Sequence, residues 1–378
     1  MLIKQEEILI MLNKENNQNI SDVDNSTVNQ AGRDVTIVNN NGLQAKDVIA
    51  IVDHLVSSKL AEYSSKAQQT AHQRSQEFSK KLVEEVTKKV MEKINRFEEP
   101  SIQYATRLAT LGYIKSGDVE QKENLVDLLI ERVKANEGTT LQQVMDQAIE
   151  VLPKLSKVSL ALLVLLAYRN LNFTGNINEF NNWLKSINSI LNVVNQVGSL
   201  DISYLNQCGC TVGMSGLNVY DDFLNSFIKS NDLYCCHNIS GEQYKAFLQM
   251  FNLQEVHAGL QTNISQEQFL KLISCFSINI KTKVVTPLIN CTQAIEKIQD
   301  VEMRNLLIDA AKFFTPLTQD EVRQKLVSVN SNWDKAIVLL NRSDVNCLHL
   351  TAVGNYIATR QLSKLSDRDI PMNLFYSN

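Results

Sequence analysis

The chain has 378 residues, of which 44% are hydrophobic and 21% are charged. This length and composition predict two or three globular domains with a buried core. A formal net charge of −4 argues against a general nucleic-acid coat. The seven cysteines are scattered and follow no secretory signal, which favours reduced thiols and a cytoplasmic protein.

The N-terminal region, residues 1–43, predicts a linker and a β-hairpin that assembles copies of the chain. Residues 26–30 and 34–38 alternate in polarity, and Ala31-Gly32-Arg33 joins them as a tight turn. A lone two-stranded hairpin is marginally stable in water, so we expect this one to pair with the same hairpin in other subunits. The apolar residues expected at that contact are Val28, Val35 and Ile37.

Residues 44–97 contain neither proline nor glycine and predict one long helix. Its apolar positions repeat every 11 residues, which favours a straight or slightly right-handed bundle of helices over a left-handed coiled coil. Together with the hairpin, this period predicts parallel self-association. The alternative is a long helix that packs along its own C-terminal domain. The positions expected at the seam between subunits are Val52, Val56, Leu60, Tyr63, Ala67, Ala71, Phe78 and Leu82.

Residues 98–315 predict an α-helical domain, which begins where Pro100 ends the long helix. Apolar residues recur at helical spacing in the segments 101–113, 119–136, 140–151, 159–168, 178–194, 221–229, 241–251, 266–276 and 294–314. The run 157–168 is the most apolar, but it is shorter than the roughly 20 residues that span a bilayer. It therefore predicts a buried core helix, and we expect no membrane contact. The glycine-rich segment 198–216 predicts irregular structure.

Residues 316–378 follow a pattern that is common in winged-helix modules. Helices are expected at 319–327 and 333–340, a strand at 347–351, and a helix capped by Thr351 at 352–360. Such a module would bind nucleic acid or a partner, or it would simply pack against its neighbours. DNA contact is not favoured, because the basic residues form no dense stripe. These residues are Arg323, Lys325, Lys335, Arg342 and Arg360.

Several segments together resemble an uncharacterised family of bacterial cytosolic proteins. They are the Gln-Ala-Gly-Arg-Asp-Val segment at 30–35, the long helix, the patterned run 125–133 with Glu150-Val-Leu-Pro-Lys154, and Leu350-Thr-Ala-Val-Gly354. N-terminal segments of the Gly-Arg-Asp-Val type also precede diverse bacterial proteins, some of which resemble anti-phage components. The resemblance implies a bacterial oligomer with a role in defence. It implies no activity and no catalytic residues.

One group of residues has the character of metal ligands. A Cys208-Gly-Cys210 pair and Cys235-Cys236-His237 could supply thiolates and an imidazole to zinc, with Cys208, Cys210, Cys235 and His237 as the candidates. Neither half has the usual C-x-x-C spacing, and cysteine is also a common buried residue. Buried thiols without a metal are therefore the favoured interpretation, and no cofactor is expected.

A cysteine–histidine enzyme is the remaining catalytic hypothesis. Cys210 or Cys236 would be the thiolate and His237, His257 or His349 the base. No spacing is diagnostic of this chemistry, and no nucleotide-binding, metalloprotease or serine-hydrolase motif is present.

The sequence therefore predicts a mainly α, homo-oligomeric interaction protein that binds itself and an unknown protein partner. The alternatives are nucleic-acid binding through residues 316–378 and a Cys/His-dependent enzyme.

Overall fold

Helices form most of the described structure, as the sequence predicts. The computed structural model describes residues 43–60, 65–171, 173, 175–213, 220–256, 259–289, 291–368 and 370. All of these belong to one unit, Leu43–Asn378. The hairpin expected at 26–38, with Val28, Val35 and Ile37, lies outside the described residues.

The N-terminal part of this unit is a helical bundle. Its elements are α2 (Ala45–Leu60), α3 (Ser65–Lys89), the 3-10 helix η1 (Met91–Glu98), α4 (Pro100–Ser116), α5 (Val119–Lys134), α6 (Thr140–Val151) and the 3-10 turn η2 (Leu152–Lys154). The sequence predicted α4, α5 and α6 to within a few residues. Local capping explains these boundaries: the Asp118 and Thr139 side chains accept from backbone N–H groups in the first turns of α5 and α6.

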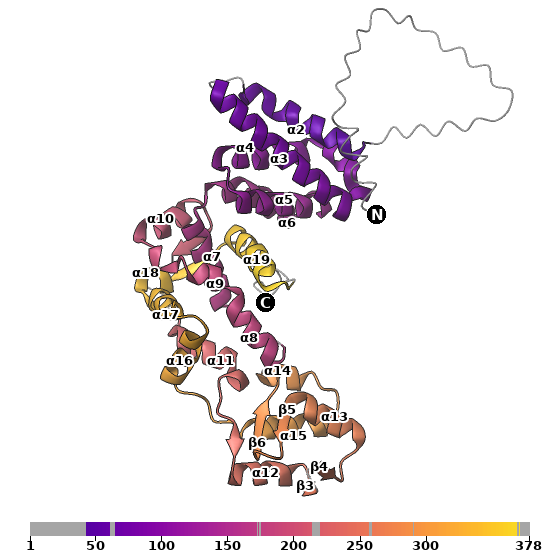
Figure 1. Ribbon diagram of the computed structural model, residues 1–378, viewed down its shortest axis with the longest axis vertical. Coiled ribbons are helices and arrows are strands. Elements are labelled where there is room, and N and C mark those ends of the chain that lie inside the picture. The colour runs from indigo at the N-terminus through magenta and orange to yellow at the C-terminus, as the bar shows by residue number, and fades with distance from the viewer. Residues whose placement is uncertain are drawn as a thin grey trace, which may run out of the picture. The chain divides into compact units, whose positions relative to one another are not determined.

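The single long helix expected at 44–97 is wrong. The helices α2 and α3 are separate and pack side by side (Figure 1). Val52, Phe78 and Leu82 are at most 1% exposed and belong to the main core of the chain. The apolar stripe that we expected between subunits is thus buried within one chain, because each helix covers its apolar face on its neighbours.

The other expected seam positions divide into three groups. Val56 and Ala71 are buried in a small cluster with Ile114 of α4. Ala67 is exposed. The side chains of Leu60 and Tyr63 lie outside the described residues.

The chain continues from the bundle into α7 (Lys157–Arg169), α8 (Ile177–Ser186), α9 (Asn188–Leu191), η3 (Val194–Gln196), α10 (Ser199–Gln207), β1 (Thr211–Gly213), α11 (Phe223–Ser230) and η4 (Asp232–Tyr234). The expectation of a buried core helix at 157–168 is confirmed, because α7 is buried from Ala161 to Tyr168. In the described part of the chain, no helix combines the length and apolarity needed to cross a membrane. Helix α10 falls within the segment that we expected to be irregular.

Residues 236–315, which we call the inserted lobe, form a second core within the expected helical domain. Its elements are β2 (Ile239–Ser240), α12 (Glu242–Met250), β3 (Leu253–Val256), β4 (Gly259–Thr262), α13 (Gln266–Cys275), β5 (Phe276–Asn279), β6 (Val284–Pro287), α14 (Cys291–Glu296) and α15 (Val301–Ala311). The strands form an antiparallel sheet in the order β2-β6-β5 and a separate β3–β4 hairpin. The helices gather around this sheet (Figure 1), and the Phe247, Phe276 and Leu307 side chains are completely buried.

Two adjacent backbone segments connect the inserted lobe to the rest of the unit. The Leu317 N–H donates to the Cys235 carbonyl at 2.7 Å, and the His237 N–H donates to the Thr315 carbonyl at 2.8 Å. The chain thus leaves and returns at the same place. Residues 98–315 thus contribute to two separate hydrophobic cores.

The C-terminal elements are α16 (Gln319–Val329), α17 (Trp333–Asn341), α18 (Ser343–Asn346), β7 (Leu348–Leu350) and α19 (Ala352–Ser366). The predicted order of helix, helix, strand and helix is confirmed, but the winged-helix module is not. Strand β7 pairs with β1, antiparallel, with Thr211 opposite Leu350. Trp333 and Tyr356 are fully buried in the main core, so residues 316–370 complete that core rather than forming a module of their own.

Helix α19 begins at an unusually close backbone contact. The Thr351 N–H donates to the Cys210 carbonyl at 3.0 Å, and Thr351 Oγ1 also caps the helix by accepting from the Gly354 N–H at 3.1 Å. A Cβ built on Gly354 would lie 1.9 Å from the Cys210 carbonyl oxygen. Glycine is therefore required at position 354 by the close approach of two backbones.

We expect Gly354→Ala to lower the free energy of unfolding by about 3 kcal/mol, because the clash is with backbone and cannot relax cheaply. Higher helix propensity returns only about 1 kcal/mol. Urea unfolding measures the difference. The control is Gly213→Ala, since a Cβ there meets nothing within 4 Å. Equal stability of the two variants would contradict the close contact.

Candidate functional site: a groove between α5 and α19

Two adjoining cavities form a groove along α5, and α7 and α19 line its opposite side. The first, of about 270 Å³, lies between α5 and the C-terminal half of α19. The second, of about 330 Å³, continues from it toward α9. They share four lining residues: Asn124, Leu152, Leu160 and Gln361.

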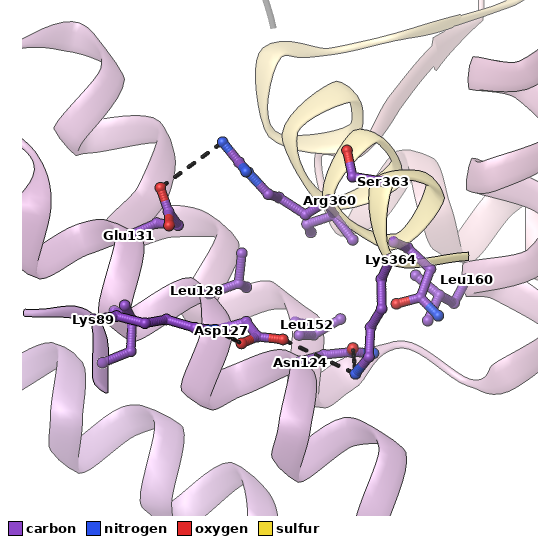
Figure 2. A pocket seen from close by; sticks show the side chains of 13 residues that line it. Lys89, Asn124, Asp127, Leu128, Glu131, Leu152, Leu160, Arg360, Ser363 and Lys364 are labelled. Atoms are coloured by element: carbon purple, nitrogen blue, oxygen red, sulfur yellow. Dashed lines mark hydrogen bonds and ion pairs between the residues drawn. The ribbon is translucent and has the colours of Figure 1, made fainter. Parts of the chain in front are cut away.

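The groove exists because α19 packs directly on α6 and α7 but reaches α5 only through long side chains. Val353, Ile357 and Leu362 bury the apolar side of α19 in the main core. Its other side presents Arg360, Gln361 and Lys364 to α5. Figure 2 shows Arg360 and Lys364 extending across the gap.

The α5 wall of the groove is an acidic stripe. Residues three and four apart share one face of a helix, so the spacing of Glu120, Glu123, Asp127 and Glu131 aligns their side chains. Lys364 Nζ pairs with Glu123 at 3.1 Å and with Asp127 at 4.0 Å. Arg360 lies 3.9 Å from Glu131, and Gln361 Nε2 donates to Glu120 at 3.0 Å.

Lys89 of α3 closes one end of this network. Its Nζ lies 3.4 Å from Asp127 and 2.8 Å from Glu85 (Figure 2 shows the contact with Asp127). Burial raises the pKa of Glu85, but hydrogen bonds from Lys81 and Lys89 outweigh it and hold the pKa at about 2. At the other end of the groove, Lys157 pairs with Asp118 at 3.1 Å. Most of the charges that line the groove are therefore paired with an opposite charge, while Glu120 accepts from the neutral amide of Gln361.

The floor of the groove is apolar. Leu128 and Ile357 contribute to the first cavity, Ile190 and Val193 to the second, and Leu160 to both. An apolar floor with a polar rim is typical of binding sites.

Three amide side chains interrupt this floor. Asn124 is 9% exposed and Gln361 is 5% exposed, and both border the two cavities. Gln121 Nε2 donates to the Leu152 carbonyl at 3.2 Å. Its buried Oε1 accepts no hydrogen bond from any residue that the structure describes.

The four zinc candidates occupy two structural positions. Cys208 and Cys210 follow α10, where the Gly209 and Cys210 carbonyls accept from Thr351. Cys235 and His237 lie where the inserted lobe joins the main core, and His237 Nε2 is 3.4 Å from Glu321. Across the described residues, no three His, Cys, Asp or Glu side chains group as metal ligands. The C-x-C motif therefore supports the start of α19.

The thiols proposed as nucleophiles are poorly suited to that role. Burial raises the pKa of Cys210, Cys235 and Cys236 to about 12, which strongly disfavours thiolates at neutral pH. Cys236 Sγ donates to the Leu233 carbonyl at 2.9 Å and not to an imidazole. His257 lies outside the described residues.

His349 belongs to a separate polar cluster that the sequence did not predict. Its Nδ1 lies 2.8 Å from the Tyr220 hydroxyl, and the Arg169 guanidinium lies 3.8 Å from the Tyr220 ring centroid. Arg169 Nη2 donates to the Leu348 carbonyl at 2.8 Å. Burial and the neighbouring Arg169 charge lower the pKa of His349. The cluster joins the end of α7 to β7, which is a structural role.

The sequence analysis did not identify the groove residues, although part of the pattern was visible. The acidic stripe on α5 and the basic positions on α19 have helical spacing, and their opposite charges could have suggested a contact. The two helices are separated by more than 200 residues, however, and a single sequence does not pair such distant segments.

Comparison with known proteins adds one finding. A protein-family model described as ":-like" matches residues 42–375. The chain belongs to this family. No curated protein and no solved structure matched the chain.

The family match has nearly the same N-terminal limit as the unit that begins at Leu43. It includes every residue of the groove and both cores. The Gln-Ala-Gly-Arg-Asp-Val segment at 30–35 lies outside it. Membership is consistent with the uncharacterised family that the sequence resembles.

The Glu85 ion pairs, which position Lys89 at the groove, predict a pH-dependent stability. Because the pKa of Glu85 is lowered on folding, its contribution is complete above about pH 4.5 and is lost as the pH falls toward 2. We expect a contribution on the order of 2 kcal/mol, allowing for the partly exposed lysines.

Urea unfolding of wild type and Glu85→Gln between pH 7 and pH 2.5 measures this contribution. The variant should be less stable at pH 7, and the difference should shrink in acid. The exposed Glu92 offers the control substitution Glu92→Gln. A constant difference between Glu85→Gln and wild type across the pH range would exclude the linkage.

Proposed function

We propose that this protein is an interaction protein that acts by association, and that the groove between α5 and α19 is its partner-binding site. The observation that carries the proposal is the groove itself: two adjoining cavities with an apolar floor, bordered by amides, serines and charges that are mostly paired within the chain. Such a surface has the means to bind and orient a partner. The described part of the groove contains no nucleophile–base pair for covalent chemistry.

Nucleic-acid binding through residues 316–378 has less support. Arg323 pairs with Asp334 and Arg342 with Asp344, each at 2.6 Å, and Lys325 donates to the Tyr234 carbonyl at 2.7 Å. These side chains are therefore committed to contacts within the chain, whereas phosphate binding requires available cations.

Self-association through residues 1–43 remains part of the proposal. Its support is the hairpin pattern of the sequence, which requires pairing to be stable. The burial of Val52, Phe78 and Leu82 within one chain removes the support that the long helix had supplied. We also propose a cytoplasmic, bacterial setting with a role in defence, on the resemblance alone.

The first prediction from this proposal concerns the groove. A photo-reactive benzoylphenylalanine in place of Ser189, which is exposed and lines the second cavity, should cross-link to one defined segment of one partner protein in the native host. The same residue in place of Ser328, exposed on α16 and outside both cavities, should not. Mass spectrometry identifies the adducts.

Identical adducts from both positions, or none from position 189, would contradict a partner site in the groove. The identity of the partner also tests the proposed setting. A toxin, nuclease or phage protein would support a defence role, and a partner of general metabolism would count against it.

The second prediction concerns assembly. Light scattering should find the full chain in an oligomer and residues 43–378 as a monomer, because the pairing segment is removed while both cores stay intact. If the two proteins have the same subunit number, residues 1–42 do not assemble the chain.

A further inference from the structure

The chemistry of the groove restricts which partner it can bind, given the proposed function on which this inference rests. Lys364, Lys89 and Lys157 each have a carboxylate partner within the chain at 3.4 Å or less. A charged ligand would have to displace these pairs and would gain little in return. The complementary ligand is therefore uncharged where it contacts the groove.

The uncharged polar side chains that line the cavities are amides and serines. Gln121 lines the second cavity, and its buried Oε1 accepts no hydrogen bond from the described residues. Asn124 and Gln361 are nearly buried at the junction of the two cavities. Side-chain amides both donate and accept, which matches the alternating N–H and C=O groups of a polypeptide backbone.

The apolar surface has two adjoining parts. Leu128 and Ile357 line the first cavity, Ile190 and Val193 line the second, and Leu160 lies between them. In an extended chain, side chains two residues apart point the same way and lie about 7 Å apart. Two apolar side chains at positions i and i+2 can therefore occupy neighbouring cavities while the backbone passes over the amides at their junction.

We propose that the groove binds an extended, uncharged segment of a partner protein, with apolar side chains at i and i+2 in the two cavities. One backbone N–H of that segment donates to Gln121 Oε1. The affinity comes from apolar burial, and the amides fix the register of the backbone. The charged side chains at the rim bridge the two walls of the groove and make no ion pair with the ligand.

The probe is the neutral pentapeptide acetyl-Ala-Leu-Ala-Leu-Ala-amide, added to the full-length protein and followed by NMR. Binding should be saturable, and replacing either leucine of the peptide by aspartate should weaken it at least tenfold. The dissociation constant should change less than about twofold between 50 and 500 mM salt, because no new ion pair forms. Binding that weakens steeply with salt, or that prefers the aspartate peptides, overturns the proposal.

A double-mutant cycle tests the hydrogen bond between the peptide backbone and Gln121. The peptide is N-methylated at each position in turn, and methylation at one position should weaken binding about tenfold, which corresponds to one lost hydrogen bond. Gln121→Met should weaken the parent peptide by a similar factor and should make methylation at that position neutral. Equal losses with wild type and Gln121→Met overturn the assignment of Gln121.

Ser189→Trp, which fills the second cavity from its rim, should abolish binding, and Ser328→Trp should leave it unchanged. Melting temperatures of both variants show whether each is folded. Retained binding by folded Ser189→Trp overturns the proposed place. If no pentapeptide binds but the cross-link at position 189 still identifies a partner, the peptide proposal fails while the proposed function stands.

Discussion

The contact between the start of α19 and the backbone at Cys210 is the constraint on which the arrangement of the chain depends. Thr351 bonds the Gly209 and Cys210 carbonyls, and Gly354 allows the helix to lie directly against Cys210. From that fixed start, α19 extends over α7 and α6. A C-terminal helix thereby joins the N-terminal bundle to the middle of the chain.

The same placement of α19 creates the groove. One side of the helix is buried, so its other side has a fixed distance from α5. This distance is bridged by Lys364, Arg360 and Gln361 rather than by close packing. The ion pairs contribute little to stability by themselves, since partly exposed pairs are screened. They span the space between the two helices, above the apolar residues that line the cavities.

Much of the local structure could be predicted from sequence, because it depends on local interactions. The expected helix at 140–151 matches α6, and Thr351 caps α19 as its hydroxyl and the following residues suggested. The strands of the inserted lobe were missed because each is only two to four residues long, too short for an alternating pattern to be distinctive. Helix α10 was missed because the glycines around it, Gly198 and Gly209, mark its two ends.

The features that decide function depended on long-range contacts. The 11-residue period of 44–97 includes Val52, Phe78 and Leu82, which are buried, but it could not tell a neighbour in the same chain from one in another subunit. Both arrangements satisfy the same apolar stripe, and the packing of α2 against α3 within one chain decides in favour of the first. The groove was hidden for a related reason, since its walls come from helices far apart in sequence. An apolar period shows that one face of a helix must be buried, but only the fold shows which element buries it. Here α2 packs against α3, whereas part of α5 lines the groove.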